Sequence, residues 1–200
     1  MNEQLGRGRG FASCHLAEEV GRRRLVKTAG AIFGALLLAG HTPYGQWTIY
    51  RRRNLFIVAS RTDKRAVQLA QMIAEKLAEE LPESRARFTR ANDTVRVASL
   101  LATEQLDVAV ISADEAVRIF TGSGEFRATG PVPLRLLAEL NQHVVTTTET
   151  FSEKHAYVLA QALEHIGPKL GFTLWRDQKS GIPEHPGAIL YRETRDALRR

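Results

Sequence analysis

The chain has few of the residues and motifs on which enzyme chemistry usually depends. Its 200 residues include one cysteine, Cys14, so no disulfide can form within the chain. We find no nucleophile elbow (G-x-S-x-G), no phosphate-binding P-loop and no H-E-x-x-H zinc motif. The acidic pairs at 79–80 and 114–115 are adjacent in sequence, and adjacent side chains on a helix point apart. We therefore expect that the protein is not an enzyme.

The sequence also lacks a metal-ligand pattern. His143, His155, His165 and His185 are widely spaced, and no cysteine accompanies them. Two histidines share one helix face at a separation of four residues, whereas His155 and His165 are ten apart. We expect no metal and no cofactor, and we interpret His185 as a brace for a proline-rich turn.

Net positive charge is missing from most of the chain, although the total is +6. Residues 1–53 hold nine of the 28 Arg and Lys residues but three of the 22 acids, which leaves 19 of each sign over 54–200. A nucleic-acid partner requires a basic face on the folded domain, because phosphate neutralisation drives binding. We expect no nucleic acid, and anionic lipid headgroups are the more natural counterpart of the basic residues.

The basic residues flank the one strongly apolar run, at 28–40. Its 13 residues match the core of a signal peptide and fall short of the roughly 20 that a membrane-spanning helix needs. Arg22 and Arg23 resemble a twin-arginine export signal. We interpret 1–24 as a basic N-terminal region and 25–47 as a hydrophobic helix, either a cleaved signal peptide or a membrane anchor. Both predict a bacterial periplasmic protein, exported or tethered to the inner membrane.

The rest of the chain alternates between strand and helix patterns. Apolar, β-branched runs at 54–60 and 107–112 predict strands, and so does the alternating segment 86–90. Helical periodicity predicts helices at 66–81, 95–102 and 113–120. This alternation predicts an α/β domain over 54–194, with a mainly parallel sheet flanked by helices.

The segment after Gly130 has a different pattern. Residues 134–148 predict one or two strands, and Ser152 predicts the start of a helix that closes at Gly167. Residues 172–175 have the character of a strand. A segment rich in proline and glycine and a charged C-terminus follow.

Polar residues follow each of the first three predicted strands. Ligands of open α/β sheets bind at the carboxyl ends of parallel strands. The candidate ligand-binding residues are therefore Ser60, Thr62, Asn92, Asp93 and Ser112. The alternative is that Asn92, Asp93 and Ser112 serve only as helix caps, since these residue types bind free backbone N–H groups at helix starts. Asp63 is expected to cap a helix in the same way.

The strongest family resemblance is near the C-terminus. Residues 182–188 (IPEHPGA), followed by Tyr191 and Glu193, look like the closing signature of the TAXI-family solute-binding proteins of TRAP transporters. Three further stretches resemble family segments in the correct order: 100–112, 122–140 and 155–163. The resemblance implies a domain like one lobe of a type II periplasmic binding protein. It also implies transporter membrane subunits as partners and a small carboxylate or amino acid as ligand.

The chain departs from this family in two places. About ten residues separate Leu140 from Phe151, where the family inserts its second lobe, so that lobe is missing here. The loop 60–64 contains no glycine, whereas the family's first loop approaches its ligand with bare backbone. Two functions stay open: a solute-binding or accessory component of a TRAP-type transporter, or a membrane-anchored sensor or protein-interaction module that has lost ligand capture.

Overall fold

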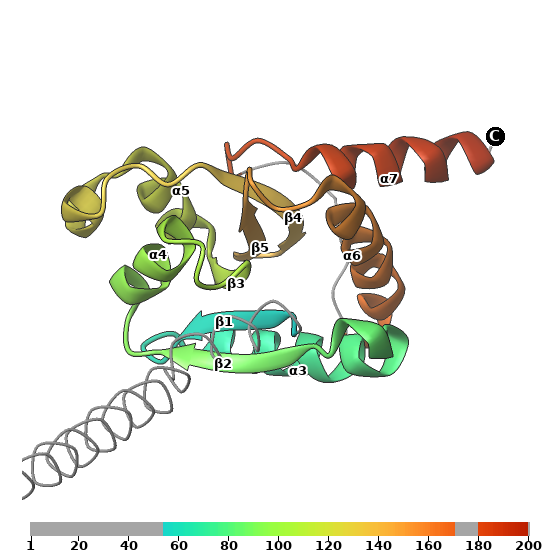
Figure 1. Cartoon of the computed structure of the whole chain (residues 1–200), viewed down its shortest axis with the longest axis horizontal. Helices are drawn as coiled ribbons and strands as arrows, with labels where there is room; N and C mark the ends of the chain where they lie inside the picture. Colours follow the sequence, from blue (N-terminus) through green and yellow to red (C-terminus); the bar gives the residue numbers. More distant parts are fainter. Residues whose placement is uncertain (1–53, 171–179, 200) are drawn as a thin grey trace, which may run out of the picture. The chain divides into compact units, whose positions relative to one another are not determined.

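The computed structural model describes residues 54–170 and 180–199. The expected N-terminal region and hydrophobic helix, and the expected strand at 172–175, lie outside these residues. Within the described part, one sheet has five strands in the order β2-β1-β3-β5-β4 (Figure 1). The strands are β1 (Phe56–Ser60), β2 (Arg87–Ala91), β3 (Val108–Ser112), β4 (Leu134–Leu140) and β5 (His143–Thr148).

Helices flank this sheet, as the alternating sequence pattern predicted. The helices are α3 (Lys64–Glu80), α4 (Thr94–Ala102), α5 (Ala113–Thr121), α6 (Glu153–Ile166) and α7 (Pro186–Leu198). Short 3-10 turns lie at η1 (Pro82–Ser84), η2 (Gly124–Ala128) and η3 (Pro168–Leu170). The α/β class is thus confirmed, and the first three predicted strands and helices lie within a few residues of their expected positions.

The sheet is mixed, so the expectation of a mainly parallel sheet was wrong. Strand β1 pairs in parallel with β2 and β3, but β5 pairs antiparallel with both β3 and β4. Strands β4 and β5 form a hairpin because the chain reverses at Asn141, which has a left-handed φ of 60°. A two-residue connection can join only antiparallel strands, since a parallel return needs a long crossover.

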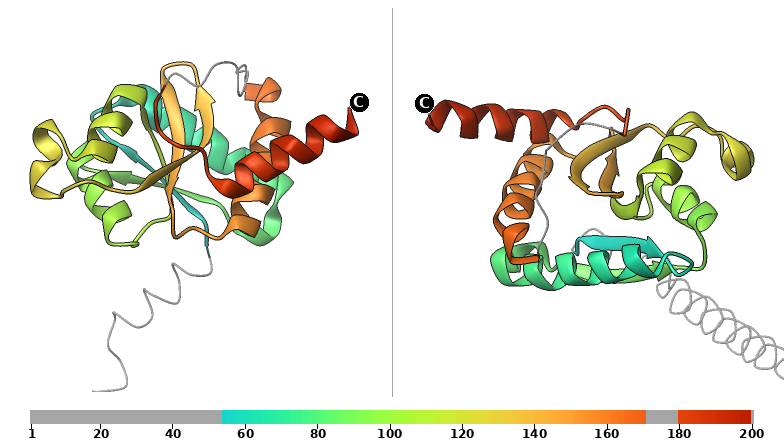
Figure 2. Two further views of the ribbon diagram at one scale, coloured as in Figure 1. Left: turned by 90° about the horizontal axis from the view of Figure 1, so that it is seen from above. Right: turned by 180° about the vertical axis from the view of Figure 1, so that it is seen from behind.

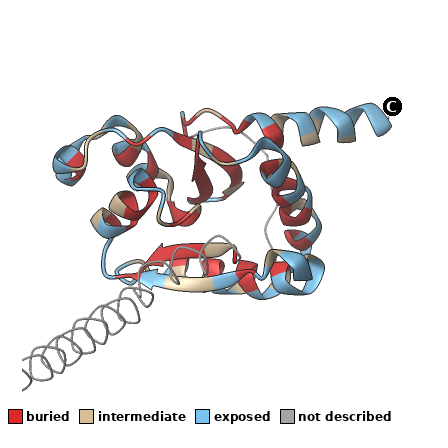
Figure 3. Ribbon diagram, in the orientation of Figure 1, coloured by how far each residue is buried: buried red, intermediate tan, exposed pale blue. Residues whose placement is uncertain are grey.

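Both faces of the sheet are buried, which explains the continuous apolar runs in its central strands. Ile57 and Ala59 of β1 pack with α3 and α6, whereas Val58 between them packs with α4. Strand β3 divides its side chains between the same two layers. Figure 2 shows the helices on the two sides. Figure 3 shows that burial concentrates on the inner strands and on the helix faces toward them, whereas the edge strand β2 is partly exposed.

Helix α7 was not expected from the sequence, because its first turn belongs to a segment rich in proline and glycine. His185 caps it: Nδ1 of the imidazole accepts a hydrogen bond from the Gly187 amide at 3.1 Å. Pro186 occupies the first turn, where a missing N–H costs nothing. The other ring nitrogen, Nε2, lies 3.0 Å from the carbonyl oxygen of Phe151. His185 therefore joins the start of α7 to the chain before α6.

Gly187 allows α7 to lie directly on α6. A Cβ atom at this position would clash with the carbonyl oxygen of Glu153 and lie 2.8 Å from the amide nitrogen of Tyr157. Further along, Arg195 forms an ion pair with Glu164 of α6 at 2.8 Å. The segment 182–188 thus has a clear structural role, the docking of the last helix.

We predict that Gly187→Ala destabilises the domain by about 1–3 kcal/mol, because one added methyl group must displace backbone of α6. Urea denaturation of the full chain measures this change. Glu193→Ala, on the exposed side of α7, is the matched control and should alter the free energy of unfolding by less than about 0.5 kcal/mol. Equal stabilities of the two variants would contradict the close helix packing.

Candidate functional site

The five candidate residues all lie where β1, β2 and β3 end. We call this end of the parallel strands the carboxyl edge of the sheet. Ser60 is the last residue of β1 and pairs with Ala91, which directly precedes Asn92 and Asp93. Ser112 ends β3 and pairs with His143, the first residue of β5. The parallel register thus brings the three loops together, as the sequence predicted. The antiparallel return of β5 adds His143 to the same edge.

Ser60 and Thr62 form hydrogen bonds with each other. The two hydroxyl oxygens lie 2.6 Å apart, and the Thr62 amide donates to Ser60 Oγ at 3.3 Å. Ser60 is 1% exposed, whereas Thr62 is exposed. The buried Ser60 hydroxyl therefore holds the loop through its hydrogen bonds with Thr62. Of the two residues, Thr62 is the one that faces solvent.

The loop after β2 contains one helix-capping residue, Asp93, and one exposed side chain, Asn92. Asp93 Oδ1 accepts from the amide of Arg96 at 2.7 Å and so caps α4. Asn92 is exposed, and its side chain makes no hydrogen bond with other residues of the described part. Capping accounts for Asp93, as its residue type indicated, and Asn92 is left available at the edge.

Ser112 belongs to a short hydrogen-bond chain that crosses from β3 to α4. Its hydroxyl donates to Glu115 Oε2 at 2.7 Å, and the Thr94 hydroxyl donates to Glu115 Oε1 at the same distance. Ser112 also accepts from the Glu115 amide at 3.4 Å and so caps α5. Sequence reasoning missed Glu115 as part of the edge. The spacing Ser-x-x-Glu, typical of a capping box, is the signal that could have found it.

Asp63 and His143 form the strongest contact at this edge. Asp63 Oδ1 caps α3 by accepting from the Ala66 amide at 2.9 Å, and Oδ2 lies 2.9 Å from Nε2 of His143. Burial raises the pKa of the Asp63 carboxyl, but hydrogen bonds from Ala66 and His143 outweigh it and lower the pKa overall. Asp63 was expected only as a cap. No sequence signal connects it with a residue 80 positions away.

A cleft of about 350 Å³ opens beside this pair. Its polar lining comes from the first turn of α3 and the turn between β4 and β5, and its floor is apolar. The lining residues are Arg65, Leu69, Leu140, Asn141, Gln142, His143 and Leu170. Arg65 is exposed and forms no ion pair within the described part of the chain. The cleft thus offers a guanidinium group and two side-chain amides as hydrogen-bond donors.

Other kinds of site are not seen in the residues that the structure describes. No three His, Cys, Asp or Glu side chains in 54–170 and 180–199 come close enough to hold a metal ion. No helix in these same ranges is both long and apolar enough to span a bilayer. The chain matches no known protein-family model and no functionally characterised protein.

We predict that Asp63→Asn leaves the cap of α3 intact but removes the charged contact with His143, because asparagine is also a good N-cap. A carboxyl with a lowered pKa stabilises the fold above its unfolded pKa and loses that contribution as the pH falls through the folded value. The difference in unfolding free energy between the native chain and Asp63→Asn should therefore be present at pH 6. It should disappear as the pH falls below the ordinary value of 3.8.

Chemical denaturation over this pH range measures the effect. Asp93→Asn is the matched control, because Asp93 caps α4 with no partner in a distant segment; we expect it to change stability by less than about 0.5 kcal/mol at pH 6. A pH-independent difference between the native chain and Asp63→Asn would mean that the Asp63 charge does not stabilise the fold.

Proposed function

We propose that residues 54–199 form a solute-binding domain that takes a small carboxylate or an amino acid at the carboxyl edge of β1 and β3. The observation that carries this proposal is the cleft lined by Arg65 and the 141–143 turn. None of the five residues expected from the sequence, Ser60, Thr62, Asn92, Asp93 and Ser112, lines it. A guanidinium group binds a carboxylate through two parallel hydrogen bonds, and side-chain amides supply further donors. Ligand binding at this edge is also the general rule for open α/β sheets.

The proposal extends to the role suggested by the family resemblance. The domain would act as a solute-binding or accessory component of a TRAP-type transporter of the TAXI family, in the bacterial periplasm and exported or tethered to the inner membrane. The resemblance in 182–188 supports this role, although its side chains dock α7 rather than line the cleft. The absence of a second lobe in the sequence makes the cleft an open one, so we expect weak binding that no hinge closure strengthens.

The alternative function was a membrane-anchored sensor or interaction module that uses an apolar face at this edge. Large exposed apolar side chains of the described residues are Val117, Val158, Leu190 and Leu198. None of them belongs to the loops that follow β1, β2 or β3. The polar character of these loops favours a small polar ligand over an apolar protein surface, so we retain solute binding as the proposal.

We predict that a C4 or C5 dicarboxylate or an acidic amino acid raises the melting temperature of the full chain. Ligand at ten times its Kd stabilises the native state by about 1.4 kcal/mol. In a domain of this size that corresponds to a rise of roughly 3–6 °C. Arg65→Ala should remove most of the rise, because the ligand carboxylate loses its guanidinium partner.

Arg96→Ala is the matched control, since Arg96 lies in the first turn of α4 and does not line the cleft. It should leave the ligand-induced rise unchanged. A flat melting temperature across dicarboxylates and amino acids, at concentrations up to tens of millimolar, would count against solute binding and in favour of the sensor or interaction module.

A further inference from the structure

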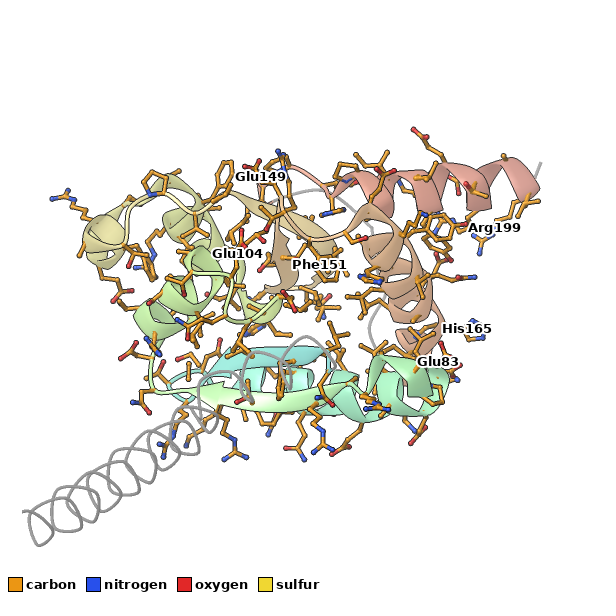
Figure 4. All side chains as sticks on the ribbon, viewed as in Figure 1. Glu83, Glu104, Glu149, Phe151, His165 and Arg199 are labelled. Carbon is orange, nitrogen blue, oxygen red and sulfur yellow. The ribbon has the colours of Figure 1, made fainter. Side chains whose placement is uncertain are left out.

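A second, larger cleft lies at the opposite edge of the sheet, where β1, β2 and β3 begin. Its volume is about 450 Å³, within the range of small-molecule sites. The walls come from the residues that precede these strands, from the end of α3 and from the first turns of α6. They are Asn54, Leu55, Leu81, Glu83, Ser84, Asp107, Phe151, His155, Val158 and Leu159. Figure 4 labels Glu83 and Phe151, two of its wall residues.

The walls of this cleft combine an apolar surface with carboxylates. Leu55, Leu81 and Leu159 come from three different elements, and Phe151 and Val158 add to the same surface. The acidic wall residues are Glu83 and Asp107; His155 belongs to the same wall, and no Lys or Arg of the described part accompanies them. This composition contrasts with the cleft at the carboxyl edge, where Arg65 lies among polar side chains.

Asp107 is the unusual residue of the set. Thr147 Oγ1 donates to its backbone carbonyl at 2.6 Å, which fixes the start of β3. Its half-buried carboxylate forms no hydrogen bond or ion pair with any residue that the structure describes. Burial raises the pKa of the Asp107 carboxyl, and the nearby charge of Glu104 adds to this effect, whereas the nearby His155 side chain partly opposes it. A partly desolvated carboxylate without a partner costs stability, and such groups gather at binding sites.

We infer that the cleft at the amino ends of β1 and β3 binds a small organic amine, whose ammonium group pairs with Asp107 while its hydrocarbon part packs on Leu55, Leu81 and Phe151. Charge complementarity selects this class of ligand, because an ammonium group supplies the hydrogen-bonded ion partner that no described residue, His155 included, gives the Asp107 carboxylate. An apolar body gains from the burial of the leucine and aromatic surface. The ring of Phe151 can also attract a cation held near its face.

This inference is independent of the proposed function, since the two clefts lie at opposite ends of the same strands. No residue of the described part lines both clefts, although α3 contributes to each: its C-cap Leu81 lines one and Arg65 of its first turn lines the other. A carboxylate in one cleft and an amine in the other would therefore not compete for the same residues. Failure to bind a dicarboxylate would contradict the proposed function and would not bear on the amine site. Failure to bind the amine would contradict the amine site and would not bear on the proposed function.

The experiment titrates the full chain with 2-phenylethylamine at pH 7 by isothermal titration calorimetry. The matched probe is 3-phenylpropionate, which has the same ring and a similar chain but a negative charge. We expect the amine to bind at least tenfold more tightly than the carboxylate, because Asp107 attracts one and repels the other. Asp107→Asn should remove this preference and weaken amine binding about tenfold or more.

Two further variants make the result specific. Asp114→Asn removes an exposed acid of α5, outside the cleft, and should leave amine binding unchanged. Val158→Trp places a large side chain at the exposed rim of the cleft and should block the amine. The melting temperature of Asp107→Asn should equal or exceed that of the native chain at pH 7, since the substitution removes a charge that burial disfavours.

The inference is overturned if the amine and the carboxylate bind equally, or if neither binds at millimolar concentration. It is also overturned if Asp107→Asn and Asp114→Asn behave alike while both remain folded. Loss of amine binding in Asp107→Asn and Val158→Trp, with retention in Asp114→Asn, supports it.

Discussion

The antiparallel pairing of β5 with β3 is the constraint on which the rest of the domain depends. It joins three parallel strands, formed by residues 56–112, to a hairpin that arises later in the chain. Hydrogen bonds outside the ladder reinforce both ends of this pairing: the Ala113 amide donates to Gln142 O, and the Thr147 hydroxyl donates to Asp107 O. With β5 in place, His143 reaches Asp63, and the start of α3 is tied to the last pair of strands.

The same pairing gives the domain two chemically different ends. At the carboxyl ends of the parallel strands, hydroxyl, amide and guanidinium groups surround the Asp63–His143 contact. At the amino ends, leucine and phenylalanine side chains line a cleft with the Asp107 carboxylate, which forms no hydrogen bond or ion pair with the residues that the structure describes. Helices cover both apolar faces of the sheet, and the two clefts lie at the two ends of its parallel strands.

Local signals predicted the first half of the domain and left the long-range contacts undetermined. The strand and helix alternation over 54–121 follows from periodicity, and Asp63, Asp93 and Ser112 cap the helices that their residue types indicated. The direction of β5 depends on pairing with a strand 30 residues earlier, so the pattern of 134–148 could not decide it. Helix α7 was hidden because His185 is an uncommon cap and the prolines and glycines suggested a loop. Contacts such as Asp63–His143 leave no trace in local sequence.

Amide hydrogen exchange at residue resolution tests the central claim, that the parallel strands and the hairpin form one cooperative sheet through β3 and β5. We predict that the hydrogen-bonded amides of β1, β3 and β5 exchange only through global unfolding, with the same free energy of opening and the same denaturant dependence. Strand β4 is an outer strand of the sheet, and its amides should exchange as fast as those of β1, β3 and β5 or faster. Exchange of β5 through a separate, lower-energy opening that leaves β1 and β3 protected would contradict the account.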